Sequence, residues 1–179
     1  MRSIQRSPDF RSARIHRVLV IGHFENPNIR KTFEEEFVRQ WSRRGVQAVS
    51  SLSVLPSSAP LNKATVAPFA RAKGFDTVLV ARVLERKKIR PGEPVVPTIE
   101  PPTPNELQDP NSVWPILLSP PVSPREFNLV TVETNLCDVA SGRRLWSGWS
   151  ETEAMKKIPK LIPPFVKLVL KDLYAGKPK

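Results

Sequence analysis

The stretch LVTVETNLCDVASGRRLWSGWSETE, residues 129–153, decides the fold of this chain. Two runs rich in Val, Thr, Leu and Trp flank residues 138–142, and Gly142 can take the positive φ that a longer hairpin loop needs. The stretch therefore predicts a long β-hairpin. Because two strands alone are marginally stable in water, we expect the rest of the chain to complete a sheet around it.

Alternate residues divide the predicted hairpin into two faces. If Leu136 lies opposite Trp146, one face carries Val130, Val132, Thr134, Leu136, Trp146, Gly148 and Ser150. The other, more polar face carries Trp149 beside Leu145 and Glu151. We expect structural roles for Leu136, Trp146 and Trp149, and a buried, paired position for Glu133 or Asn135. A slip of one residue would exchange the two faces, and the sequence leaves that alternative open.

Three further strands are predicted before the hairpin. Residues 17–24 (RVLVIGHF) and 77–84 (TVLVARVL) are continuous apolar runs, which suit strands covered on both faces. Residues 46–55 alternate loosely and predict another strand.

The first helix is predicted to open at Asn26-Pro27, where Asn caps free N–H groups and Pro loses no hydrogen bond. Glu35 and Arg39 form an expected outer ion pair, and Gly45 ends the helix. Apolar residues recur every four positions and predict a core face: Ile29, Phe33, Phe37 and Trp41.

Two more helices are predicted. A short one ends before Gly74, with Thr65 as its expected cap. The last begins at Pro163-Pro164, ends at Gly176, and carries an apolar face that we expect to cover the hairpin.

The sequence therefore predicts an α/β (α+β) fold: a mixed β-sheet with helices packed on it, in the order β-α-β-α-β, then a Pro-rich insertion, the hairpin and a C-terminal helix. We expect one domain over residues 17–176, a loosely held basic arm over residues 1–16, and a tail over 177–179. Residues 91–124 contain 11 of the 20 prolines and cannot join the sheet. They predict a stiff, exposed loop, with a polyproline ligand for a partner domain as the alternative.

The net charge of +11 lies mainly at the two ends of the chain. Residues 1–17 carry +4 and residues 155–179 carry +6, so the residues between them carry only +1. This balance predicts no continuous basic groove in the body of the protein, and it argues against nucleic acid as a partner. Cys137 is the only cysteine, which excludes an internal disulfide and a Cys-based metal site.

No catalytic, phosphate-binding or metal-binding motif is present, so we expect no enzyme, no cofactor, no metal and no small-molecule substrate. No run approaches the ~20 apolar residues of a membrane span, and no secretory signal is expected before Arg17. One weak candidate site lies where a strand ends just before a helix N-terminus, a common ligand position in α/β sheets. A small anion or a partner would be contacted there by Gly22, His23, Asn26, Asn28 and Arg30.

Three stretches resemble a family of small bacterial envelope lipoproteins of unknown function. They are RVLVIGHFENPNIRKTFEEEFVRQWSRRGVQAV (17–49), ARAKGFDTVLVARVLERK (70–87) and VTVETNLCDVASGRRLWSGWSET (130–152), and Pro8-Asp9-Phe10 resembles the segment after the lipidated cysteine. The resemblance implies an α/β sandwich similar to the N-terminal domain of the Tol translocation protein, without catalytic residues. The family's lipidated Cys and its signal are missing from this chain.

We therefore expect a non-catalytic accessory domain of the periplasm or the inner face of the outer membrane. Its expected partner is another envelope protein or component, with membrane association through a lipid anchor that this chain lacks. The alternative is a cytoplasmic basic protein that binds nucleic acid through its charged tails.

Overall fold

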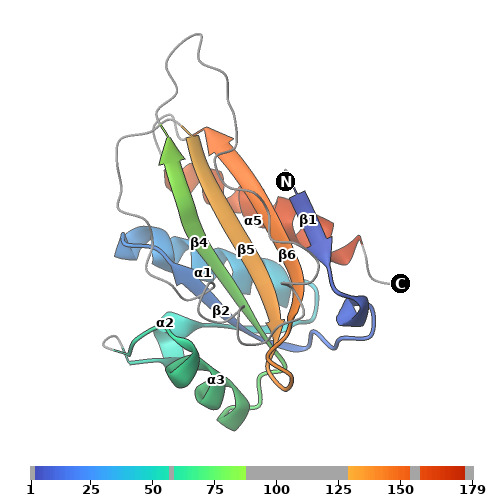
Figure 1. The fold of residues 1–179 in the computed structure, drawn as a ribbon. Helices are drawn as coiled ribbons and strands as arrows, with labels where there is room; N and C mark the ends of the chain where they lie inside the picture. The colour runs from blue at the N-terminus through green and yellow to red at the C-terminus, as the bar shows by residue number, and fades with distance from the viewer. Residues whose placement is uncertain (1–2, 57–58, 88–128, 154–157, 176–179) are drawn as a thin grey trace.

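The computed structural model describes residues 3–56, 59–87, 129–153 and 158–175 (Figure 1). The proline-rich residues 91–124 and the tail 177–179 lie outside the described residues. The elements are β1 (Ser3–Arg6), η1 (Pro8–Phe10), β2 (Arg17–His23), α1 (Pro27–Ser42), β3 (Gln47–Ser50), α2 (Ser51–Val54), α3 (Lys63–Ala72), β4 (Thr77–Lys87), β5 (Leu129–Asp138), β6 (Arg144–Glu153) and α5 (Ile158–Tyr174).

The described strands form one mixed sheet in the order β1-β6-β5-β4-β2-β3. β2 pairs in parallel with β3 and β4, as expected for strands joined by crossover helices, while β4, β5, β6 and β1 pair antiparallel. The predicted fold class is confirmed. β4 and β5 pair as far as Lys87 and Leu129, which lie opposite each other. The proline-rich residues 91–124 fall between these two positions in the sequence.

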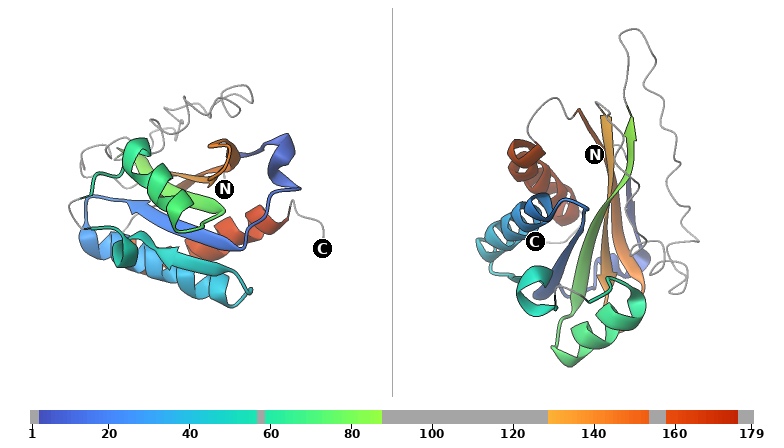
Figure 2. Two further views of the ribbon diagram at one scale, coloured as in Figure 1. Left: turned by 90° about the horizontal axis from the view of Figure 1, so that it is seen from below. Right: turned by 90° about the vertical axis from the view of Figure 1, so that its left-hand side faces the viewer.

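Helices cover both faces of the sheet. α1 and α5 lie side by side on one face and α3 lies on the other (Figure 2). Val18 and Val20 pack on the α1–α5 side, and Leu19 and Ile21 pack on the α3 side, so β2 is buried on both faces as predicted.

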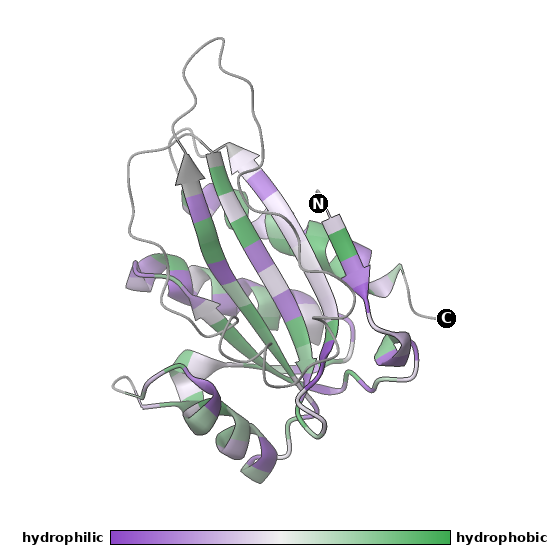
Figure 3. Cartoon of the chain, in the orientation of Figure 1, coloured by the Kyte–Doolittle hydropathy of each residue, from purple (hydrophilic) through white to green (hydrophobic). Residues whose placement is uncertain are grey.

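The hairpin register is confirmed, because Leu136 lies opposite Trp146. Both residues are fully buried beneath α1 and α5. Figure 3 shows the resulting alternation of apolar and polar residues along β5. The expected position of Leu145 on the polar face is wrong: the register shifts between Leu136 and Cys137, and this irregularity turns Leu145 into the core with Trp146.

The first helix follows the prediction at its cap and core. Asn26 accepts hydrogen bonds from the N–H groups of Asn28 and Ile29, and Phe33, Phe37 and Trp41 are buried. The predicted outer pair is wrong. Glu35 lies 3.9 Å from Lys31, and Arg39 instead pairs with Glu36, because partners three residues apart also share a face of the helix.

Three boundaries differ from the predictions. Residues 46–55 form only the short β3 before the chain turns into α2 at Ser51. Asn62, not Thr65, caps α3, since its side chain accepts from the Thr65 N–H. α5 begins at Ile158, so Pro163 and Pro164 lie inside the helix and not at its start.

The expected loose arm over residues 1–16 is also wrong. Ser3–Arg6 pairs antiparallel with β6, and Phe10 is fully buried in the core. The Arg6 guanidinium donates to the Asp172 carbonyl at 2.6 Å, which ties the arm to α5. A sheet edge offers unpaired backbone groups, so even a polar segment gains hydrogen bonds by adding a strand there.

Candidate functional site

The predicted anion site at the end of β2 is occupied by the protein's own carboxylate. Glu34 has a fully buried side chain. Its Oε1 atom accepts hydrogen bonds from the Gly22 N–H at 2.9 Å, from Arg30 Nε at 3.0 Å and from Ser51 Oγ at 2.8 Å. Its Oε2 atom accepts from Ser50 Oγ at 2.6 Å and from the Leu52 N–H at 3.1 Å. The Gly22 N–H and the Arg30 Nε, two of the donors expected to contact an external anion, are therefore used by Glu34.

The five predicted contact residues have separate roles in the structure. Gly22 and Arg30 both donate hydrogen bonds to Glu34. The Asn26 side chain caps α1 by accepting a hydrogen bond from the N–H of the exposed Asn28. His23 is half-buried, and its pKa is lowered by burial and then by the nearby Arg30 and Arg82 guanidinium groups. The residues are brought close together, but around an internal ion pair. The sequence predicted the helix N-terminus and missed Glu34, which lies beside Phe33 at the edge of the apolar stripe.

A second charged cluster lies on the sheet face opposite α1 and α5. Glu133 is 1% exposed, and its Oε2 atom lies 2.8 Å from Arg82 Nε while Oε1 lies 3.6 Å from Arg144 Nη1. Arg144 also donates to Asn135 Oδ1 at 3.3 Å. The prediction of a buried, paired Glu133 is confirmed. Next to this cluster, burial raises the pKa of the Cys137 thiol, which therefore stays protonated and behaves as a small apolar group.

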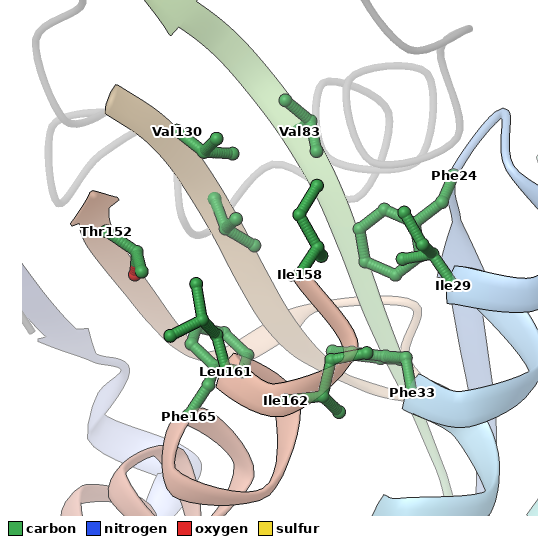
Figure 4. Close-up of a pocket in the computed structure, with 11 residues that line it drawn as sticks. Phe24, Ile29, Phe33, Val83, Val130, Thr152, Ile158, Leu161, Ile162 and Phe165 are labelled. Carbon is green, nitrogen blue, oxygen red and sulfur yellow. The ribbon is translucent and has the colours of Figure 1, made fainter. Parts of the chain in front are cut away.

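The structure contains an apolar pocket that the sequence did not predict. It lies where the first turns of α1 and α5 meet β4, β5 and β6, and its volume is about 70 Å³. Figure 4 shows side chains from these elements pointing into a common space. The lining residues are Phe24, Ile29, Phe33, Val83, Val130, Val132, Thr152, Ile158, Leu161, Ile162 and Phe165.

Aromatic packing shapes one wall of this pocket. The Phe33 ring lies 4.9 Å from the Phe24 ring, edge to face, and 6.2 Å from the Phe165 ring. A Cβ atom on Gly22 would lie 2.9 Å from the Phe24 ring. Gly22 is therefore required for the placement of Phe24, not for an anion.

The chemistry of the pocket favours an apolar occupant. Among the described residues that line it, Thr152 is the only polar one, and none of them is titratable. An apolar cavity of this kind stays dry and accepts aliphatic or aromatic groups. Its volume is about half that of a cavity known to hold benzene, at about 150 Å³. The pocket therefore fits one branched aliphatic side chain better than a whole acyl chain.

None of the helices in the described part of the chain is long and apolar enough to cross a membrane. No protein-family model matches the chain, and no curated protein matches it.

Solved structures of similar arrangement include a PelC dodecamer from Paraburkholderia phytofirmans. It is 17% identical to this chain, with a TM-score of 0.49, and the match covers 96% of this chain and 94% of that chain. Lipoprotein GNA1162 from Neisseria meningitidis is 13% identical, with a TM-score of 0.44 and coverage of 90% and 99%. At these scores no residue role is transferred from either protein.

Proposed function

We propose that this chain is a non-catalytic bacterial envelope domain that binds a partner protein by taking an aliphatic side chain into the pocket between α1 and α5. The apolar pocket is the observation that carries the proposal, since it is concave and apolar as small ligand sites are. The three stretches that resemble envelope lipoproteins support the location. The solved structures, with TM-scores below 0.5, add no weight to it.

The lining explains why binding, and not catalysis, is the function proposed. General acid–base or nucleophilic catalysis needs a titratable group within hydrogen-bond reach of a reacting atom. The described part of the pocket lining presents one Thr hydroxyl among ten apolar side chains. A buried aliphatic side chain in a matched pocket is a common anchor of a protein interface.

The pocket can be tested with xenon as a probe, because xenon enters dry apolar cavities. Methyl resonances of Ile29, Val83 and Leu161 should shift on xenon addition in the wild type. Val130→Phe should fill the cavity and abolish the shifts. Leu168→Phe is the matched control, since Leu168 lies on α5 outside the pocket and is 37% exposed. Absence of shifts in the wild type, or equal shifts in Val130→Phe, would reject the pocket as a binding site.

The envelope location needs a separate measurement. When cells that express the native gene from its own locus are fractionated, the protein should be recovered in the periplasmic or the outer-membrane fraction. Recovery with the cytoplasmic fraction would reject the location and favour the cytoplasmic alternative.

A further inference from the structure

A basic groove lies between the C-terminal half of α1 and the middle of α5. It is lined by Arg39, Gln40, Arg43, Arg44, Pro163, Pro164 and Lys167, and its volume is about 650 Å³. Gln40 Nε2 donates to the Pro163 carbonyl at 3.1 Å and fixes the two helices against each other. Three of the four cations come from residues 18–154, whose summed charge is close to neutral, and Lys167 comes from the basic C-terminal stretch. Near-neutral charge over a long segment does not prevent cations from gathering where two helices meet.

Two of the four cations are held in place by the protein. Arg39 Nε lies 2.9 Å from Glu36 Oε2, and this hydrogen bond is the main reason that the pKa of Glu36 is lowered. Arg44 Nη1 donates to the Gln40 carbonyl at 2.9 Å, and its guanidinium lies 6.0 Å from the centre of the Tyr174 ring. These contacts, and the negative end of the α1 dipole, account for Arg39 and Arg44.

The other two cations, Arg43 at the same end of α1 and Lys167 on α5, are held less closely. Within the described residues, Arg43 and Lys167 form no ion pair and donate no side-chain hydrogen bond. Both are exposed, one on each wall of the groove. Arg43 acts on Glu36 only at a distance, helping to lower the pKa of that carboxyl, which is already hydrogen-bonded to Arg39 and Gln40. The groove therefore has an uncompensated positive charge directed at solvent.

The exposed side of α5 extends this surface. It carries Lys160 and Lys171 besides Lys167, and Leu168 lies among them with 37% of its surface exposed. Lysines around an exposed leucine on an amphipathic helix are typical of helices that lie at an anionic membrane surface. Sites for single-stranded nucleic acid pair cations with aromatic platforms, and none of the described residues that line the groove is aromatic.

We propose that the groove binds the phosphate of an anionic phospholipid headgroup, through Arg43 and Lys167, and docks the α1–α5 face on the membrane. The inference rests on the proposed envelope location for access to a membrane, but it does not require the apolar pocket to be occupied. Each basic residue near an anionic surface contributes about fivefold to binding.

The test is co-sedimentation of the full chain with vesicles of phosphatidylcholine alone or mixed equally with phosphatidylglycerol. We expect binding to the mixed vesicles only. Arg43→Gln combined with Lys167→Gln should weaken it about 25-fold. Lys63→Gln combined with Lys73→Gln is the matched control, because it removes the same charge from α3 on the opposite face of the sheet. The control should bind nearly as the wild type does.

Four outcomes would overturn the proposal. They are equal sedimentation with both vesicle types, equal weakening by both double variants, binding of inorganic phosphate without vesicle binding, and binding of an oligonucleotide duplex without vesicle binding. Val130→Phe separates this proposal from the previous one. An absence of xenon shifts in the wild type would reject the pocket as a binding site. If Val130→Phe still binds the vesicles, the proposal of a phosphate-binding groove is retained.

Discussion

At the residue scale, Glu34 shows how a buried carboxylate can accept hydrogen bonds from donors that were expected to bind a small anion. It joins the end of β2 to α1 and to the start of α2 through hydrogen bonds from Gly22, Arg30, Ser50, Ser51 and Leu52. A strand end facing a helix N-terminus collects donors, and a folded protein must satisfy them. Two of the residues that suggested an anion site, Gly22 and Arg30, thus have a role in folding.

Glu34→Ala should lower the free energy of unfolding by about 3–5 kcal/mol, the usual cost of removing one partner of a buried pair. The loss arises because Arg30, whose side chain is 20% exposed, and several buried donors lose their acceptor. Urea melts would measure it. Glu35→Ala is the control: its side chain is 62% exposed, and we expect a change within about 0.5 kcal/mol. Similar costs for both variants would contradict the role of Glu34.

His23 should make the stability of the protein depend on pH. Burial, with Arg30 and Arg82, lowers its pKa from 6.5 in the folded state, so the unfolded chain binds more protons at mildly acidic pH. Stability should therefore fall as the pH drops below about 6.5, until the folded-state pKa is passed. His23→Asn should flatten this fall in thermal melts between about pH 7.5 and pH 5.5, above the range where carboxylates titrate. An unchanged pH dependence in the variant would count against the prediction.

At the element scale, the hairpin and the N-terminal strand show the two sides of sheet formation. The hairpin carries its own pattern of alternating residues, so its two strands can be predicted, and pairing of Leu136 with Trp146 in the folded chain settles the register. β1 carries little pattern, and it forms because β6 presents an edge and Phe10 finds space in the core. Residues 3–10 therefore belong to the domain.

The two hairpin tryptophans should differ in their contribution to stability. Trp146 is fully buried beneath α1 and α5, and Trp146→Ala should cost about 3–5 kcal/mol. Trp149 lies on the opposite face beside Glu133 and is 8% exposed. Trp149→Ala should cost less, because that face is polar. Denaturant melts that gave the reverse order would contradict this difference between the faces.

Residues 91–124 should be dispensable for folding. Lys87 and Leu129 lie opposite each other in the sheet, so a short Gly/Ser linker can join β4 to β5 without moving either strand. The excised protein should keep one cooperative thermal transition. Loss of that cooperativity would show that the segment belongs to the core.

At the scale of the whole molecule, the distribution of charge matters more than its sum. Residues 1–17 and 155–179 carry most of the net charge of +11, and Lys167 of the second stretch joins Arg39, Arg43 and Arg44 in a local concentration of charge. Electrostatic attraction falls off over a Debye length of about 8–10 Å, so a partner responds to this local cluster.

Nucleic-acid binding should be weak and unspecific. The basic groove offers few phosphate contacts and no stacking platform in its lining. Binding of labelled single- and double-stranded oligonucleotides to the full chain should largely disappear between about 50 and 200 mM salt, because such contacts act by counterion release. Sub-micromolar binding that persisted at the higher salt would favour the nucleic-acid alternative over the envelope function.

Part of the candidate site could be predicted and part could not. The strand end at Gly22 and the cap at Asn26 are local patterns, and the sequence placed both. The role of Gly22 was not predictable, because its contacts with Glu34 and Phe24 are made only in the folded chain. The apolar pocket was missed because the prediction began α5 at Pro163 and so left Ile158 and Leu161 outside the helix.

The sequence by itself determined the fold class, the hairpin and the core face of α1, because periods of two and of about 3.6 residues and a capping Asn are local patterns. It left two registers open for the hairpin, and the tertiary structure decided between them. Tertiary structure alone decided the arm that became β1, the placement of Leu145 in the core, the pocket and the groove. Gln40 and Pro163, which join the walls of the groove, lie 123 residues apart in the chain. Such contacts follow from how helices pack on the sheet, and no local pattern specifies which distant side chains will meet there.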